Sequence, residues 1–401
     1  MLYRRMPQNG DELSILGFGC MRLPVKNGKI EEEVAISQIR YAIDHGVNYV
    51  DTAWPYHAGQ SEIVLGNALR DGYRQKVKLA TKLPSWMLTS RADMDRFLAA
   101  QLKKLGTDQI DYYLVHSLDG KLWDNVRQLG VCDFLEQAKK DGRIVNAGFS
   151  FHGLAGDFRR IVDAYPWVFC QIQYNYLDED NQAGTAGLEY AAAKKLGIIV
   201  MEPLRGGNLG LPTPPPAVAA IWDQAKLRRT PAEWALRWVW NRPEVTVILS
   251  GMNRLEQVQE NLSIASTAHA NALTEDELLL IQRVGRTYRE LMKVDCTGCG
   301  YCMPCPSNVT IPLCFEEYNS MHMFGTMEEG KFRYALRLSG ELVDGQPGYA
   351  SLCVRCGECI DKCPQKVPIP DMLAQVATEM EDPKLAERLA IVQQIFRIKP
   401  E

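Results

Sequence analysis

The sequence contains no apolar run of the roughly 18 residues that a membrane-spanning helix needs. Its first residues, MLYRRMPQNGDELS, lack the apolar core of a secretory signal. Basic residues are not in excess either, because 45 Lys and Arg stand against 49 Asp and Glu, a net charge of −4. Phosphate backbones select a basic surface. We therefore expect a cytoplasmic protein that binds neither membranes nor nucleic acids.

A GxGxxG loop after the first predicted strand is missing as well, which argues against an open, doubly wound dinucleotide fold. Instead, short β-branched segments alternate with segments whose apolar residues recur every three or four positions. Eight such pairs in roughly 250 residues are typical of a closed (β/α)8 TIM barrel. The predicted strands are 14–19, 47–51, 77–81, 110–116, 144–149, 168–173, 198–202 and 245–249.

The length of 401 residues exceeds what one hydrophobic core usually serves. We expect two domains, a barrel over 1–285 and a smaller, mainly α-helical domain over 286–401. Within the barrel, four prolines fall in residues 209–218, after the seventh predicted strand. Proline cannot donate a hydrogen bond to a sheet, so this stretch is expected to form a stiff loop at the barrel mouth.

Helical patterns dominate the chain beyond the barrel. A long helix is predicted over 273–294, because Thr274 and Glu277 have the spacing of a capping box at its start. The C-terminal tail is expected to be helical with a break at Pro383.

The sequence has 12 cysteines, many for a chain expected in a reducing compartment, where structural disulfides are rare. Eight of them form two runs, each followed by proline. Four are scattered and are expected to be small buried side chains: Cys20, Cys132, Cys170 and Cys314. The first cysteine run is Cys296, Cys299, Cys302 and Cys305, and the second cysteine run is Cys353, Cys356, Cys359 and Cys363.

The second cysteine run has the CxxCxxCxxxCP spacing with which ferredoxins bind [4Fe-4S] clusters. In two-cluster ferredoxins the fourth cysteine of a run binds the other cluster, so Cys363 is expected at the first cluster and Cys305 at the second. The first run departs from the pattern, because only two residues separate Cys302 from Cys305. Paired CxxC sequences also bind structural zinc, which is the competing interpretation. The helical segment between the runs is similar to that of α-helical dicluster ferredoxins.

Four polar side chains stand at or just after predicted strand ends, where barrel enzymes place their chemistry. Asp51 closes the second strand in DTAWPYHAGQSE, and Tyr56 follows five residues later. Lys82 follows the third strand, and His116 closes the fourth. The neighbouring His57 is expected to be an exposed loop residue.

The motifs DTAxxYHxGxSE, TK and LVH resemble the Asp, Tyr, Lys and His tetrad of the aldo-keto reductases over roughly residues 10 to 265. MEPLRGG and CTGCGYCMPCP are similar to an iron-sulfur subgroup of that family. The resemblance implies that Tyr56 is a general acid acting on a carbonyl. A nearby ammonium favours phenolate, so Lys82 is expected to lower the pKa of Tyr56. Asp51 would keep Lys82 charged, and His116 would orient the carbonyl oxygen.

The family binds NADP(H) across the barrel top. The resemblance assigns Ser150 and Gln171 to the carboxamide. However, Phe151 stands where many relatives have asparagine, and Met201 where they have an aromatic residue. Arg205, with two glycines after it, is a further candidate for an anion. The remaining positions, assigned to phosphate and adenine, are Ser250, Gly251, Arg254 and Asn261.

Iron-sulfur clusters pass single electrons, whereas hydride transfer moves two. Three routes stay open: FMN at the barrel mouth interconverts the two modes, the clusters act directly on substrate, or the clusters are structural. We expect an oxidoreductase that acts on a carbonyl or alcohol and exchanges electrons through two [4Fe-4S] clusters, with a ferredoxin-like protein as a candidate partner. The alternatives are a non-catalytic electron-transfer subunit and a flavin- or ferredoxin-dependent reductase without nicotinamide.

Overall fold

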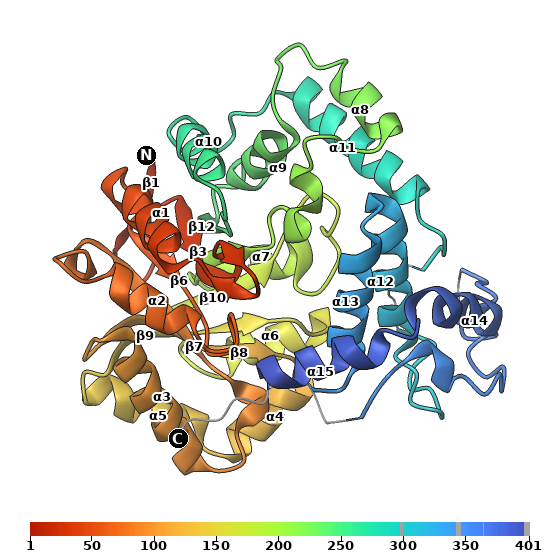
Figure 1. Ribbon diagram of the computed structural model, residues 1–401, viewed down its shortest axis with the longest axis horizontal. Coiled ribbons are helices and arrows are strands. Elements are labelled where there is room, and N and C mark those ends of the chain that lie inside the picture. The colour runs from red at the N-terminus through yellow and green to blue at the C-terminus, as the bar shows by residue number, and fades with distance from the viewer. Residues whose placement is uncertain (297, 299, 342–345, 364, 397–401) are drawn as a thin grey trace. The chain divides into compact units, whose positions relative to one another are not determined.

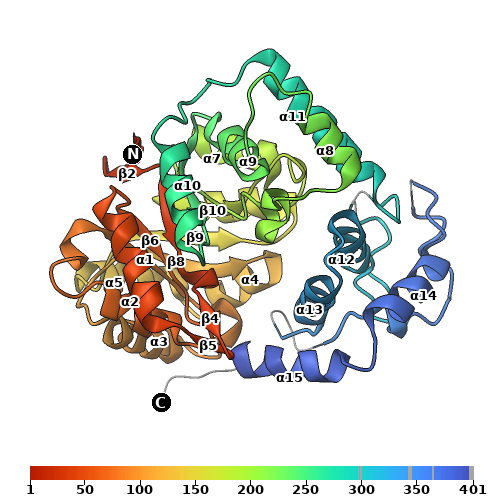
Figure 2. The ribbon, with the colours of Figure 1, turned by 45° about the horizontal axis from the view of Figure 1, so that its top comes forward.

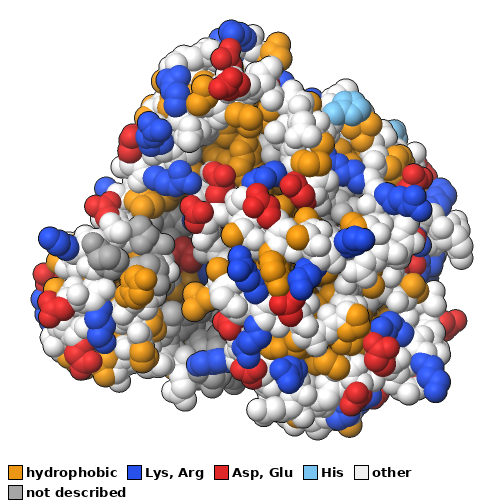
Figure 3. Space-filling model, turned by 180° about the vertical axis from the view of Figure 1, so that it is seen from behind, with side chains coloured by type: hydrophobic (Ala, Val, Ile, Leu, Met, Phe, Trp, Pro, Cys, Tyr) orange, Lys and Arg blue, Asp and Glu red, His pale blue; other side chains and the backbone are white. Residues whose placement is uncertain are grey.

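The computed structural model divides the chain into two compact units. The barrel unit comprises Met1–Pro212 and Lys226–Ile281, and the helical unit comprises Thr213–Ala225 and residues 282–396. In the described part of the chain every helix is too short or too polar to span a bilayer. Cationic and anionic side chains are intermixed on the face seen in Figure 3. The described residues are 1–296, 298, 300–341, 346–363 and 365–396.

Eight parallel strands close the barrel in the order β10-β11-β12-β3-β6-β7-β8-β9 (Figure 1). All eight predicted strands are present and the TIM barrel is confirmed, with boundaries that differ by at most two residues. The strands are β3 Leu16–Gly19, β6 Tyr49–Asp51, β7 Lys78–Leu83, β8 Ile110–Leu118, β9 Ile144–Phe151, β10 Phe169–Gln173, β11 Gly197–Met201 and β12 Val245–Ser250.

Helices follow the strands and surround the barrel, as Figure 1 shows. Successive side chains of a strand point to opposite faces. On β7, Leu79 therefore packs outward against the helices, whereas Ala80 belongs to the cluster that fills the barrel. The helices are α1 Glu32–Asp44, α2 Ser61–Ala68, α3 Arg91–Leu105, α4 Gly120–Gln128, α5 Val131–Lys140, α6 Ala155–Asp163, α7 Gly184–Ala193, α9 Pro231–Trp240 and α10 Leu255–Ala265.

Two short hairpins were not predicted: β1 (Tyr3–Arg5) with β2 (Glu12–Ser14), and β4 (Val25–Lys26) with β5 (Lys29–Ile30). Ser14, predicted as the start of the first barrel strand, belongs to β2 instead. Met6 and Leu13 of the first hairpin join the apolar cluster inside the barrel.

The proline-rich stretch is only partly a loop. Residues up to 210 lie in the 3-10 turn η4 (Arg205–Gly210), and Pro216 begins the helix α8 (Pro216–Trp222). Proline fits the first turn of a helix because the amide hydrogen that it lacks has no intrahelical partner there. The prediction of one continuous loop over 209–218 was therefore wrong at both ends.

Helices make up the helical unit, as predicted (Figure 2). The Thr274 hydroxyl accepts from the Glu277 N–H at 3.3 Å and the Glu277 carboxylate accepts from the Thr274 N–H at 2.9 Å, which confirms the capping box. The break near Pro383 is also confirmed. The helices are α11 Glu275–Glu290, whose first turns lie in the barrel unit, α12 Ile311–Phe324, α13 Met327–Leu338, α14 Ile369–Met380 and α15 Leu385–Phe396.

Candidate active site and cysteine sites

Asp51 and Lys82 form a buried ion pair inside the mouth of the barrel. Asp51 is the last residue of β6, and Lys82 lies on the neighbouring strand β7, two residues beyond the partner of Asp51. The Lys82 ammonium donates to Asp51 Oδ1 at 2.6 Å and to the Thr52 carbonyl at 2.8 Å. Lys82 is only 1% exposed and Asp51 only 2% exposed. Burial raises the pKa of Asp51, and the Lys82 charge opposes that shift.

Lys82 stays cationic in this environment. Burial alone lowers its pKa, but the charge of Asp51 and the neighbouring Tyr56 more than compensate, so that the pKa of Lys82 is raised. An ammonium that is both buried and charged needs close partners on several sides. Asp51, Thr52 and Tyr56 provide them.

Tyr56 lies in the loop between β6 and α2 and is partly buried. The Lys82 ammonium is 5.1 Å from the centre of its ring. Burial raises the pKa of Tyr56, and Lys82 lowers it by a smaller amount, so the net shift is upward. The expectation of a net decrease was wrong, because it counted the ammonium and left out desolvation.

His116 lies on β8 and completes the group. Its ring is 6.2 Å from the ring of Tyr56 and 5.1 Å from that of Trp86, measured between ring centres. Burial, with a smaller contribution from the Lys82 charge, holds the pKa of His116 well below its usual range. Its Nδ1 atom has no hydrogen-bond partner among the described residues. The imidazole is therefore neutral near pH 7 and can hydrogen-bond a substrate oxygen.

His57 is half-buried, contrary to the expectation of an exposed side chain. Its Nε2 atom accepts a hydrogen bond from the Leu23 N–H at 3.1 Å. Burial lowers the pKa of His57. This residue therefore ties the segment after β3 to the loop that carries Tyr56.

Six of the seven candidate cofactor residues form two groups at the same end of the barrel. Ser150 on β9 and Gln171 on β10 are paired in register and buried. The Ser150 hydroxyl accepts from the Ser117 N–H at 2.7 Å, whereas Gln171 Oε1 has no partner among the described residues. Phe151, next to Ser150, is buried in the apolar core, and Met201 ends β11 with partial exposure.

The second group surrounds the start of α10. Asn261 Nδ2 donates to the Ser250 hydroxyl at 3.0 Å, and both residues are buried. Gly251 and Arg254 are exposed between them. Arg254 is the residue immediately before α10, so that its positive charge lies at the positive end of the helix dipole, an arrangement that favours an anion.

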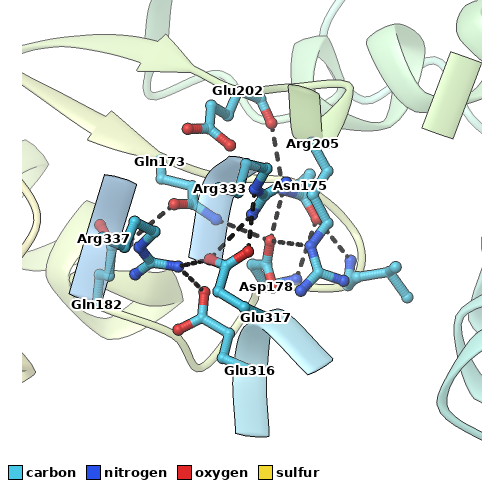
Figure 4. Close-up of polar contacts among 11 residues, drawn as sticks. Gln173, Asn175, Asp178, Gln182, Glu202, Arg205, Glu316, Glu317, Arg333 and Arg337 are labelled. Carbon is cyan, nitrogen blue, oxygen red and sulfur yellow. Dashed lines mark hydrogen bonds and ion pairs between the residues drawn. The ribbon is translucent and has the colours of Figure 1, made fainter. Parts of the chain in front are cut away.

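Arg205 belongs to a separate polar network after β10 and β11, drawn in Figure 4. Its Nε atom lies 3.4 Å from Asp178 Oδ2. The same carboxylate oxygen accepts from Gln173 Nε2 and from Asn175 Nδ2, each at 2.9 Å. Arg205 is only 7% exposed. Its guanidinium is therefore already engaged by a protein carboxylate.

Five cysteines line one cavity in the helical unit. Among the described residues, no three His, Cys, Asp or Glu side chains come close enough to hold a single metal ion. A [4Fe-4S] cluster, unlike one zinc ion, holds its thiolates apart around a larger core. The lining cysteines are Cys302, Cys305, Cys353, Cys356 and Cys359.

The other predicted ligands lie elsewhere. Cys296 and Cys363 are partly buried and pack against the apolar core of the helical unit, and Cys299 lies outside the described residues. Among the scattered cysteines, Cys20, Cys170 and Cys314 are buried as expected, whereas Cys132 is half-exposed.

Residues 15–284 match the sequence model described as "Aldo/keto reductase family". The chain belongs to the aldo/keto reductase family. Residues 295–367 match the model described as "4Fe-4S dicluster domain", so an aldo/keto reductase domain is followed by a dicluster domain in one polypeptide. The family resemblance inferred from the motifs is confirmed, as is the assignment of an aldo-keto reductase-type oxidoreductase.

Relatives of this aldo/keto reductase match about 70% of the chain. The "Probable aldo-keto reductase 1" of Glycine max is 27% identical over 68% of this chain and 86% of its own length. "Protein tas" of Escherichia coli is 28% identical over 72% of this chain and 99% of its own. The solved aldo-keto reductase AKR11C1 from Bacillus halodurans, in its holo form, superimposes with a TM-score of 0.61 at 25% identity, covering 71% of this chain and 96% of that one.

A supporting network in the reductase domain was missed at the sequence level. Buried Glu62 on α2 accepts from Thr81 and from Gln101 on α3, each at 2.8 Å. Gln101 Nε2 also donates to the Lys82 carbonyl at 2.9 Å. The network fixes the backbone of β7 at Lys82 from outside the barrel. The one sequence signal for this network was the glutamate at the end of GQSE, whose partner Gln101 lies 39 residues away and has no motif of its own.

Proposed function

We propose that this aldo/keto reductase reduces a carbonyl, or oxidises the corresponding alcohol, at Tyr56. The observation that carries the proposal is the buried Lys82 ammonium, held by Asp51 at 2.6 Å and lying 5.1 Å from the centre of the Tyr56 ring. A phenol beside a fixed cation can release its proton, because the cation stabilises the phenolate that remains. Tyr56 is then the general acid in reduction and the general base in oxidation.

The proposed roles of the other groups follow from their charge states. Burial raises the pKa of Tyr56, so that the phenol keeps its proton until charge develops on the substrate oxygen. Lys82 compensates the phenolate charge, and Asp51 keeps Lys82 protonated and oriented. His116 is neutral because burial lowers its pKa, and a neutral imidazole beside Tyr56 can orient the carbonyl oxygen by a hydrogen bond without competing as an acid.

We propose NADP(H) as the barrel cofactor. The unpaired buried Gln171 Oε1 and the neighbouring Ser150 suit the carboxamide, and Arg254 with Ser250, Gly251 and Asn261 suits phosphate at the start of α10. When bound, a nicotinamide supplies the hydride for the carbonyl carbon. Arg205 is a weaker candidate than the sequence alone indicates, because Asp178 already engages its guanidinium.

We propose that residues 286–401 form a separate domain with two [4Fe-4S] clusters, bound by crossed ligation. Cys305 lines one cavity with the first three cysteines of the second run, which is the set expected for the second cluster. The first cluster would then use Cys363 with Cys296, Cys299 and Cys302. Cys302 also lines the cavity, so its assignment is the one most in need of a test.

The clusters give the enzyme a one-electron function beside its two-electron chemistry. Two clusters together hold two electrons, the same number that one hydride carries. We propose that they exchange these electrons with a ferredoxin-like redox partner. A flavin at the barrel mouth is the second candidate, and the loss of asparagine and of an aromatic residue at Phe151 and Met201 favours it.

Anaerobic purification followed by reductive titration tests the proposal. We expect iron and labile sulfide in near-equal amounts, and loss of visible cluster absorbance on addition of NADPH or NADH. In a matched titration, the Tyr56→Phe variant should still bind nucleotide but should fail to turn over carbonyl substrates. Zinc without sulfide would refute the cluster assignment. Reduction by a reduced ferredoxin but not by either nucleotide would refute the nicotinamide and favour FMN, which extraction and fluorescence would detect.

A further inference from the structure

The segment that leads into the second cysteine run is held by hydrogen bonds from several neighbours. We call residues 347–352 the entry segment, because it ends directly before Cys353. The Gly348 N–H donates to the Leu338 carbonyl at 2.9 Å, and the Gly348 carbonyl accepts from the Thr310 N–H at 3.0 Å. A side chain at Gly348 would collide with Thr310, since its Cβ atom would lie 2.1 Å from the threonine hydroxyl. The segment therefore has little freedom to shift.

The entry segment is also linked to the first cysteine run. The Asn308 N–H donates to the Cys305 carbonyl at 3.0 Å. The Asn308 side chain donates to the Pro347 carbonyl at 2.7 Å. Asn308 therefore joins the backbone at Cys305 to the start of the entry segment. The position of the entry segment consequently sets how Cys305 and Cys353 face their shared cavity.

Two side chains, Tyr334 on α13 and Glu381 after α14, fix the end of the entry segment. The Tyr334 hydroxyl accepts from the Ala350 N–H at 2.8 Å and donates to Glu381 Oε1 at 2.6 Å. The same glutamate oxygen accepts from the Ser351 N–H at 3.0 Å. Tyr334 is fully buried and Ala350 is 1% exposed. Two successive backbone amides before Cys353 thus depend on one tyrosine–glutamate pair.

The helical unit contains a second pair of the same chemistry that serves as a comparison. The Tyr318 hydroxyl on α12 donates to Glu379 Oε1 at 2.6 Å, and Tyr318 is 2% exposed. Glu379 also contacts His322, 2.9 Å away. Tyr318 and Glu379 make these contacts between α12 and α14, and no described hydrogen bond joins either side chain to the backbone of a cysteine run.

We propose that Tyr334 and Glu381 are positioning residues for the second [4Fe-4S] cluster. They bind the backbone amides of Ala350 and Ser351. By fixing these amides, they set the direction from which Cys353 enters the cavity. Reduction potentials of such clusters respond to the geometry and the hydrogen bonds around their sulfurs. The pair therefore controls the second cluster and leaves the first unchanged. This inference rests on the proposed function, because it requires that the cysteine runs bind clusters.

The test compares Tyr334→Phe and Glu381→Gln with the control Tyr318→Phe in the full chain, purified without oxygen. Potentiometric titration with electron paramagnetic resonance gives a midpoint potential for each cluster, and Cys356→Ser identifies which signal belongs to the second one. We expect the second potential to shift in both test variants and the first to stay constant. Release of iron from the second cluster to a chelator should become about tenfold faster, the factor that corresponds to one lost buried hydrogen bond. Tyr318→Phe should change neither quantity.

Equal behaviour of Tyr334→Phe and Tyr318→Phe would refute the inference while leaving the clusters themselves in place. A wild-type protein without iron and sulfide would instead refute the proposed function. Hydrogen exchange of the wild-type protein covers the case in which the variants do not accumulate. The amides of Ala350 and Ser351 should exchange as slowly as those in the middle of α13, and rapid exchange there would refute the inference without any variant.

Discussion

Asp51→Asn tests the buried ion pair on which the proposed chemistry depends. The substitution keeps the size of the side chain but removes the charge that lies 2.6 Å from the Lys82 ammonium. Lys82 is 1% exposed, so it cannot recover the lost interaction from water. Removing one partner of a buried pair costs about 3–5 kcal/mol, a large share of the about 5–15 kcal/mol by which domains are stable. We expect the free energy of unfolding of the barrel unit to fall by about that amount.

The double substitution Asp51→Asn with Lys82→Met separates the lost attraction between the two charges from the cost of leaving a buried ammonium without a partner. It removes both charges, so the buried ammonium no longer lacks a partner, and we expect the double variant to be more stable than Asp51→Asn alone. The exposed pair Asp44–Lys76, 2.9 Å apart, supplies the control. Asp44→Asn should leave stability unchanged within error, because solvent screens that pair.

Urea unfolding followed by tryptophan fluorescence measures these differences, since Trp54, Trp234 and Trp240 are buried in the barrel unit. The Asp51–Lys82 pair should also make the free energy of unfolding depend on pH. The pKa of Lys82 is raised in the folded protein, so its contribution to stability is complete below about pH 10 and is lost as pH rises through the higher folded value. A loss in Asp51→Asn no greater than that in Asp44→Asn would refute the buried ion pair.

Three further outcomes are expected. Tyr56→Phe should lower kcat by about two to four orders of magnitude with unfolding unchanged, and a steady-state assay with Tyr73→Phe as the control measures this. Burial holds the pKa of His116 well below its usual range, so the free energy of unfolding should fall as pH drops below about 6.5. His116→Gln should make this dependence on pH less steep in urea titrations at several pH values, and an unchanged dependence would contradict the prediction. Cys356→Ser should remove about half of the iron, and full retention would contradict its place at the second cluster.

Much of the barrel could be predicted from the sequence because its signals are local. Alternating β-branched and helical segments located all eight strands, and the strand-end positions of Asp51, Lys82 and His116 followed from them. The capping box at Thr274 is similarly local, since both of its residues lie within one turn. Spacing alone also identified the cysteine runs, one of which supplies three residues to a single cavity.

The predictions that failed depended on burial or on distant partners. The sign of the Tyr56 pKa shift follows from desolvation, which a motif does not report. Asp178 was not foreseen as the partner of Arg205, because the two residues follow different strands. The β1–β2 hairpin is short, and its residues carry no periodicity by which it could be separated from the first barrel strand.

The anchoring of Lys82 through Gln101 has a consequence for how this enzyme can change its substrate. Gln101 and Glu62 belong to α3 and α2 and are fully buried, yet they hold the main chain of the lysine from behind. The β6–α2 loop carries Tyr56 and the Thr52 carbonyl, so it belongs to this setting as well. Among the described residues, the side chains of Gln101 and Glu62 make no hydrogen bond to the other loops that surround the opening. Those other loops can be exchanged or lengthened to admit a new molecule while the proton donor keeps its setting, whereas the inner surfaces of these two helices have to stay as they are.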